Sequence, residues 1–152
     1  MAETEATRSN FQNHTVLIVD DTPANLETLY SYLESLGFEI MMAQNGPTAL
    51  KRVEYAKPDI ILLDVVMPGM DGFETCRRLK AAEATKNIPV IFMTALTDTV
   101  HKVQGLQAGA ADYITKPFQL EEVLARVQTH LALRDLQSQL ERQNTRLQLE
   151  IR

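Results

Sequence analysis

The stretch PDIILLDVVMPGMDG, residues 58–72, carries an apolar run straight into a carboxylate. Residues 60–63 are all aliphatic, Asp64 follows at once, and the backbone then passes through Pro68-Gly69. A short continuous apolar run is typical of a strand buried on both faces, and a Pro-Gly pair is typical of a turn. The sequence therefore predicts a buried strand that presents Asp64 at its end.

The same pattern, a short run of apolar residues, recurs along the chain. Apolar runs rich in β-branched residues lie at 16–19 and 90–93, and weaker candidate strands lie at 38–43 and 111–115. Between these runs, apolar residues recur at helical spacing. Together with the turn residues, that spacing predicts helices that begin at Pro23, near Gly46, at Gly72, at Asp98 and near Gln119.

Strands and helices therefore alternate five times with short connections. This alternation predicts an α/β domain, a five-stranded parallel sheet with helices on both faces. Right-handed crossovers leave few topologies, and the flavodoxin-like order 2-1-3-4-5 is the natural one for five strands. The last helical pattern runs on to Arg152 without Pro or Gly, so we expect an extended last helix.

Two of the helix starts carry capping patterns. Thr22-Pro23 combines an N-cap residue with a first-turn proline. Asp71, followed three residues later by Glu74, resembles a capping box. We therefore expect both helices to begin where these residues stand.

Size and composition narrow the class of protein. The chain has 152 residues, enough for one domain, and a formal net charge of −5, which argues against nucleic-acid binding by this chain. No apolar run approaches the ~20 residues of a membrane span. A single cysteine and a polar N-terminus without a signal-peptide pattern predict a cytoplasmic protein. Residues 1–14 are expected to form a mobile leader.

Polar residues stand where the predicted strands end. In a parallel sheet the carboxyl ends of the strands share one edge, where ligands of such folds bind. The residues at this edge are Asp20, Asp21, Asp64, Thr94 and Lys116. The predicted strand order places them around one small pocket.

Three carboxylates in one pocket repel each other, and a hard divalent cation relieves that repulsion. Mg²⁺ prefers oxygen ligands and is usually held by one or two carboxylates together with waters and phosphate oxygens. Lys116 can pair with a phosphate oxygen, and Thr94 can donate a hydrogen bond to it. Asp64 is then placed to act as a nucleophile that forms an aspartyl-phosphate.

Four segments together resemble the receiver domain of two-component response regulators. They are Asp20-Asp21, LLDVVMPGMDG (62–72), FMTALTD (92–98) and DYITKPF (112–118). The resemblance covers about residues 15–131. Four motifs in the right order and spacing are far more specific than any one of them.

The resemblance implies a role for each site residue. Asp64 takes a phosphoryl group from a sensor histidine kinase or a phosphotransfer protein. Asp21, Asp64 and the Val66 carbonyl bind Mg²⁺, with Asp20 acting through water. Thr94 and the Ala95 amide contact the phosphoryl group, Lys116 pairs with it, and the Lys116-Pro117 peptide is cis. The chain is then no enzyme beyond its own phosphoryl transfer and hydrolysis.

The resemblance also implies a switch. Tyr113 matches the family's aromatic switch position, and it would act together with Thr94. The positions that tune hydrolysis in the family are Val66 and Leu96 here, both apolar, so the lifetime of the phosphoryl group stays open.

Two other functions stay open at this point. A haloacid-dehalogenase-type phosphatase also uses a nucleophilic aspartate with threonine and lysine, but its Asp-x-Asp after the first strand reads Asp20-Asp21-Thr22 here. A flavodoxin-like binding module should offer Ser, Thr and Gly to a flavin phosphate, whereas this loop offers two acids. Turnover of a phosphate ester would identify the first alternative.

The C-terminal segment 132–152 predicts a helical linker. Leucines 133, 136, 140 and 147 continue an apolar seam beyond the domain, diluted by Gln143, Asn144 and Glu150. We expect this seam to pair in a parallel coiled coil and to give a homodimer. The sequence does not indicate which output domain, kinase or signal belongs to the chain.

Overall fold

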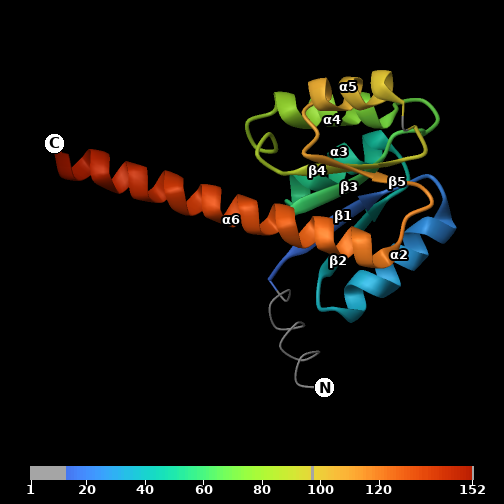
Figure 1. Ribbon diagram of the computed structural model, residues 1–152, viewed down its shortest axis with the longest axis horizontal. Helices are drawn as coiled ribbons and strands as arrows, with labels where there is room; N and C mark the ends of the chain where they lie inside the picture. The colour runs from blue at the N-terminus through green and yellow to red at the C-terminus, as the bar shows by residue number, and fades with distance from the viewer. Residues whose placement is uncertain (1–12, 97, 152) are drawn as a thin grey trace.

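The computed structural model describes residues 13–96 and 98–151, and within them five strands alternate with five helices (Figure 1). The elements are β1 (Thr15–Val19), α2 (Pro23–Ser35), β2 (Glu39–Ala43), α3 (Gly46–Tyr55), β3 (Ile60–Asp64), α4 (Gly72–Ala81), β4 (Val90–Thr94), α5 (Thr99–Ala108), β5 (Asp112–Thr115) and α6 (Leu120–Ile151). The predicted alternation is confirmed. The predicted leader lies outside the described residues, apart from Asn13 and His14.

The five strands form one sheet in the order β2-β1-β3-β4-β5, and every neighbouring pair is parallel. This is the predicted flavodoxin-like order. Because the strands are parallel, their carboxyl ends lie at one edge of the sheet and their amino ends at the other.

Two apolar layers hold the helices on the sheet. On β3, Ile61 and Leu63 face the layer under α3, α4 and α5, whereas Ile60 and Leu62 face the layer under α2 and the first part of α6. Figure 1 shows the helices divided between the two faces in this way. All four of these side chains are fully buried, and each buried aliphatic side chain contributes roughly 1.5–3 kcal/mol. A continuous apolar run therefore becomes a central strand.

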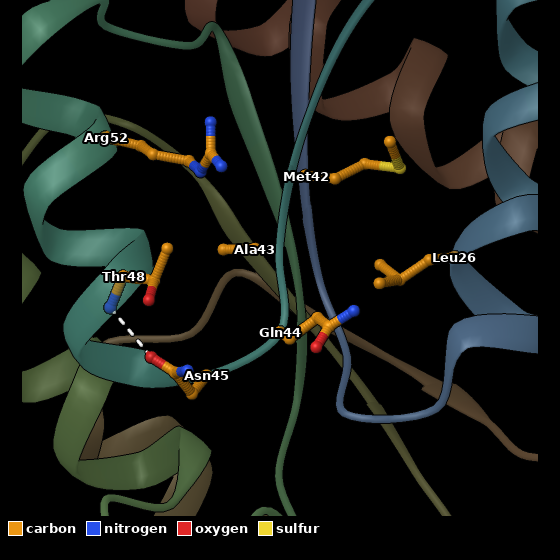
Figure 2. Close-up of a pocket in the computed structure, with 7 residues that line it drawn as sticks. All are labelled: Leu26, Met42, Ala43, Gln44, Asn45, Thr48 and Arg52. Atoms are coloured by element: carbon orange, nitrogen blue, oxygen red, sulfur yellow. Dashed lines mark hydrogen bonds between the residues drawn. The ribbon is translucent and has the colours of Figure 1, made fainter.

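The helix starts agree with the capping patterns in part. The Asp71 carboxylate accepts a hydrogen bond of 2.9 Å from the Glu74 amide, as predicted. Asn45 caps α3 in the same way, through the Thr48 amide at 2.8 Å (Figure 2). Thr22 occupies the N-cap position of α2, but its side chain makes no capping hydrogen bond. The backbone amide of Thr22 instead donates a hydrogen bond of 2.9 Å to the Asp20 carboxylate. Thr22 therefore contributes to the position of Asp20 rather than to the cap of α2.

Helix α6 has two parts. Val123, Val127 and Leu131 are buried against the sheet, and Leu131 is the last buried residue of the helix. Beyond it the helix projects away from the body of the molecule (Figure 1). The extended last helix is thus confirmed. None of the helices in the described ranges is both long and apolar enough to cross a membrane.

Candidate phosphoryl and metal site

The predicted strand-end residues converge at the carboxyl edge of the sheet. Asp20 follows β1, Asp64 is the last residue of β3, Thr94 is the last residue of β4, and Lys116 follows β5. Strands β1, β3, β4 and β5 are successive neighbours in the sheet. Residues separated by almost a hundred positions in the sequence therefore line one pocket.

Three carboxylates lie close together in the pocket. One oxygen atom from each of Asp20, Asp21 and Asp64 lies within 4.8 Å of the other two. Asp20 and Asp64 are 0% and 4% exposed, whereas Asp21 is exposed. Two of the acids are therefore buried, and the third is exposed to solvent.

Lys116 is the cation that faces these acids. Its ammonium lies 3.1 Å from an Asp20 oxygen and 3.2 Å from an Asp64 oxygen. Burial by itself would lower the pKa of Lys116, but the hydrogen bond and the charge of Asp20, together with Asp64, outweigh it and raise that pKa. Lys116 thus stays protonated and can pair with an anionic group bound at Asp64.

Asp64 is held in an unfavourable electrostatic position. Burial and the charges of Asp20 and Asp21 raise its pKa to about 6, although Lys116 acts in the opposite direction. One lysine does not compensate three neighbouring carboxylates. The pocket therefore favours an additional positive charge beside Asp64.

The loop after β3 turns back on the end of the strand that carries Asp64. The Val65 carbonyl accepts a hydrogen bond of 2.8 Å from the Gly72 amide, which closes the loop on itself. Gly69 adopts φ +76°, a backbone conformation that L side chains rarely take. A side chain at Gly72 would collide with the backbone of Asp64 and Val65. The Pro-Gly turn and the close approach of Gly72 thus explain why the chain breaks directly after its buried strand.

Asp20 is positioned by neighbours that the sequence did not indicate. Its carboxylate accepts hydrogen bonds from the Thr22 amide and from the Asn25 side-chain amide, the latter at 3.2 Å. Asn25 lies in the first turn of α2. In the sequence, only its position shortly after Pro23 could have indicated that it lies near Asp20. These bonds orient Asp20 while leaving Asp21 free to face solvent.

Thr94 and Ala95 lie beside the acids on the β4 side. The Thr94 hydroxyl accepts a hydrogen bond of 2.9 Å from the Leu96 amide, which leaves its own proton free to donate. Ala95 and Lys116 line an adjoining hollow of about 530 Å³ together with Asn25, Thr28, Pro117 and Phe118. The Lys116-Pro117 peptide bond is cis, as the resemblance implies.

Tyr113 is half-buried between β5 and α5. Its hydroxyl lies 3.0 Å from the His101 carbonyl and 2.8 Å from the Lys102 carbonyl, so it donates to the backbone of α5. Its ring lies against Gly105, where a Cβ atom would collide with it. Tyr113 therefore links β5 to the helix that follows Thr94.

A second hollow lies along β2, between α2 and α3 (Figure 2). Met42 and Gln44 lie between Leu26 of α2 on one side and Thr48 and Arg52 of α3 on the other. The hollow measures about 390 Å³, and no carboxylate is among its lining residues. It offers no arrangement for phosphoryl or metal chemistry.

Comparison with known proteins identifies the family. The model of the response regulator receiver domain matches residues 16–128. The chain belongs to this family. It is 46% identical over 114 residues to the response regulator PleD of Caulobacter vibrioides, which covers 75% of this chain and a quarter (25%) of PleD. A receiver domain is a signalling module rather than a catalytic enzyme, so the phosphatase alternative is wrong.

Two solved structures of receivers agree with this assignment. The crystal structure of a putative response regulator from Chloroflexus aurantiacus has a TM-score of 0.75 and 39% identity, over 78% of this chain and 98% of that one. The receiver domain of the sensor histidine kinase PA1611 from Pseudomonas aeruginosa has a TM-score of 0.73 and 31% identity, over 78% of this chain and 98% of that one. That second structure holds a magnesium ion in its active-site cleft.

The residues of this chain fit a hard divalent cation. The donor set consists of oxygen atoms, and three carboxylates lie close enough to share one ion. Burial and the neighbouring carboxylates raise the pKa of Asp64, and a bound cation would oppose that shift. The acidic triad resembles the magnesium site seen in receiver domains.

Proposed function

We propose that this receiver is a phosphoacceptor whose nucleophile is Asp64 and whose donor is a phosphohistidine on a sensor histidine kinase or a phosphotransfer protein. The observation that carries the proposal is the position of Asp64, a nearly buried carboxylate at a strand end, 3.2 Å from Lys116 and beside two further acids. Aspartate nucleophiles form covalent phosphoryl intermediates, and receiver domains take phosphate from histidine kinases.

The transfer requires an ionised Asp64. One carboxylate oxygen forms the bond to phosphorus while the bond from phosphorus to the histidine nitrogen breaks, and the departing imidazole takes up a proton. Lys116 then pairs with a phosphoryl oxygen, and the Thr94 hydroxyl and the Ala95 amide donate to the others. Positioning and charge neutralisation supply most of the catalysis of phosphoryl transfer.

The residues that would hold Mg²⁺ are Asp20, Asp21, Asp64 and the Val66 carbonyl, with Asp20 acting through water. Bound there, Mg²⁺ supplies positive charge both to the acids and to the incoming phosphoryl oxygens. Asp20 and Asp21 hold the charge close to Asp64, and Lys116 keeps the opposite side of the pocket positive. Val66 and Leu96 add no polar group that would orient an attacking water.

The same proposal includes a conformational readout. A phosphoryl group on Asp64 would draw the Thr94 hydroxyl inward, and Tyr113 would move into the space that Thr94 leaves. Tyr113 is bonded to the α5 backbone at His101 and Lys102, so its movement would repack the surface of α5, β5 and α6. Phosphorylation shifts this equilibrium by its differential affinity for the two states.

We also propose that residues 15–131 form the receiver domain and that residues 132–152 form a helical linker, which pairs with a second copy as a parallel coiled coil. Leu133, Leu136, Leu140 and Leu147 are about half exposed along the projecting part of α6. Burying each leucine contributes roughly 1.5–3 kcal/mol before the cost of association, so the dimer should be weak. Gln143 and Glu150 interrupt the seam.

The phosphoryl proposal is tested by incubating the protein with acetyl phosphate and Mg²⁺ and measuring the intact mass. One phosphoryl group should add to the wild type, and Asp64→Asn should abolish the addition. The matched control is Asp59→Asn, an aspartate at the other end of β3, which should label like the wild type. Labelling of Asp64→Asn at the wild-type level would contradict the proposal.

The dimer is tested by analytical ultracentrifugation across a range of concentrations. Leu140→Asn should weaken self-association because it places an amide in the apolar seam, whereas the neighbouring Gln139→Asn should not. A wild-type chain that stays monomeric at high micromolar concentration, or equal association of both variants, would remove the coiled coil from the proposal.

A further inference from the structure

The amino-terminal end of the sheet carries a second charged hollow, on the opposite side of the molecule from the acids. It measures about 380 Å³ and lies between the last turn of α4, the loop 82–89 and α6, just beyond the point where α6 leaves the sheet. The polar side chains that line it are Lys80, Lys86, Asn87, His130, Arg134 and Gln137. No carboxylate is among its lining residues, although the chain carries a net charge of −5.

Lys80 is fixed in place before any ligand binds. Its ammonium donates to the carbonyl oxygens of Lys86 at 3.0 Å and Ile88 at 2.6 Å, and its aliphatic stem packs over Gly109. These partners are neutral dipoles, so the positive charge of Lys80 is oriented without being cancelled. Burial lowers the pKa of Lys80, and the nearby charge of Arg134 acts in the same direction.

Arg134 supplies the second fixed cation. Its guanidinium donates to the Asp59 carbonyl at 2.7 Å, while the Asp59 carboxylate lies farther away, at 3.4 Å. The remaining guanidinium nitrogens are available for a planar, bidentate contact with an anion. Lys80 and Arg134 therefore present two cations, on two different helices, to one space.

The carboxylates around the hollow neutralise only part of its charge, since Arg134 forms an ion pair with Asp59 at 3.4 Å while Lys80 forms none within the described residues. Glu83 pairs with Lys86 at 2.9 Å, but the Glu83 side chain is 88% exposed, and such a pair is screened by solvent. Asp112 is bound by Arg126 and by His130, each at 2.9 Å. The positive charge of Lys80 stays without a carboxylate partner within the described part of the chain.

We propose that this hollow binds a small molecule that carries a phosphomonoester group. The arrangement of the fixed Lys80 ammonium, the Arg134 guanidinium and a second lysine, Lys86, matches a dianionic phosphate. The amides of Asn87 and Gln137 can hydrogen-bond the rest of such a molecule, and the volume falls in the range of small-molecule sites rather than of a single ion.

A ligand in this place would also connect two helices. Lys80 lies in the last turn of α4, whereas Arg134 and Gln137 lie on α6 within two turns of Leu131, its last buried residue. Contacts to both sides would hold the root of the projecting helix against the domain. This binding is independent of phosphoryl transfer to Asp64.

The test is an NMR titration of the uniformly ¹⁵N-labelled chain with adenosine monophosphate, in the presence of EDTA so that no divalent metal occupies the acidic pocket. Saturable shifts are expected for amides 86–89 and 130–137. Lys86→Gln should weaken binding about fivefold and Arg134→Gln about tenfold, whereas Lys51→Gln on the exposed surface of α3 should leave it unchanged. The spectra of the free variants report whether each remains folded.

Two further probes separate the sources of the signal. Adenosine, which lacks the phosphate, should cause no saturable shift, and inorganic phosphate should bind more weakly than the nucleotide. Shifts that grow linearly with concentration, equal binding of adenosine, phosphate binding as tight as that of the nucleotide, or equal affinities in Lys86→Gln and Lys51→Gln would each overturn the proposal.

Discussion

Aspartates stand at both ends of the sheet, but their surroundings differ. At the carboxyl end, Asp20 and Asp64 share the cation Lys116, and Asp21 adds a third carboxylate. At the amino end, Asp59 accepts a 2.7 Å hydrogen bond from the Thr15 amide and faces Arg134. Asp112 is bound by the Tyr113 amide, Arg126 and His130. The amino-end acids each face cations of their own, whereas Asp20 and Asp64 at the carboxyl end share one cation.

The pKa values follow this difference. Burial and neighbouring acids raise the pKa of Asp64 to about 6. Burial would also raise the pKa of Asp112, but the hydrogen bonds from His130 and Tyr113 and the charge of Arg126 outweigh it and lower that pKa. A carboxylate whose ionised form destabilises the fold, such as Asp64, is typical of a site that binds a ligand. A carboxylate whose ionised form stabilises the fold, such as Asp112, is typical of a structural contact.

The largest expected effect is on folding stability when Asp64 is neutralised. Because its pKa is higher in the folded chain than in the unfolded chain, ionised Asp64 destabilises the metal-free protein. Asp64→Asn should therefore raise the free energy of unfolding by about 2–3 kcal/mol above pH 6.

That gain should shrink as the pH falls from about 6 to about 4, where the wild-type carboxyl takes up its proton. Urea denaturation with EDTA at the two pH values measures it, and Mg²⁺ should reduce it at the higher pH. Asp135→Asn, on the exposed part of α6, serves as the control and should change little. A destabilised Asp64→Asn at high pH would show that the crowding of acids is not costly.

The next effect concerns metal affinity. Asp21 is exposed, so Asp21→Asn should leave the fold intact while it removes one of the carboxylates that attract the cation. We expect the affinity for Mg²⁺ to fall about tenfold or more. Isothermal titration measures it, with Asp98→Asn as the control at an exposed aspartate outside the triad. An unchanged affinity would exclude Asp21 from the ligand set.

The smallest effect belongs to the amino end and has the opposite sign. Asp112→Asn should lower the free energy of unfolding by about 1 kcal/mol at neutral pH, because it weakens the contacts with Arg126 and His130. The pKa of Asp112 is lowered in the folded chain, so this contribution is present above about pH 4 and is lost as the pH falls below it. A stabilised variant would remove the contrast between the two ends.

The fold was predictable because its signals are local. The apolar run that ends at Asp64 became the central strand β3, and the alternation of strands and helices gave the observed order. The convergence of Asp20, Asp64, Thr94 and Lys116 followed from that order, since parallel strands share one carboxyl edge. Capping by Asp71 was also readable from its spacing to Glu74.

The remaining contacts could not be predicted because they join distant residues through side-chain geometry. The bond from Asn25 to Asp20 depends on the first-turn orientation of α2. The partners of Asp112 come from α6, and those of Lys80 are backbone carbonyls in the following loop. At Thr22 the sequence signal was present but the predicted contact did not form. The Thr22 side chain makes no capping hydrogen bond, and its amide donates to the Asp20 carboxylate instead.

The projecting part of α6 can convert a small rotation at its root into a larger movement of its far end. Beyond Leu131, 20 residues of helix (132–151) extend about 30 Å at about 1.5 Å per residue. A rotation of about 10° at the root would move the far end sideways by about 5 Å. A small repacking beside Tyr113 or at the hollow lined by Lys80 and Arg134 would thus become a much larger displacement at the far end of the helix.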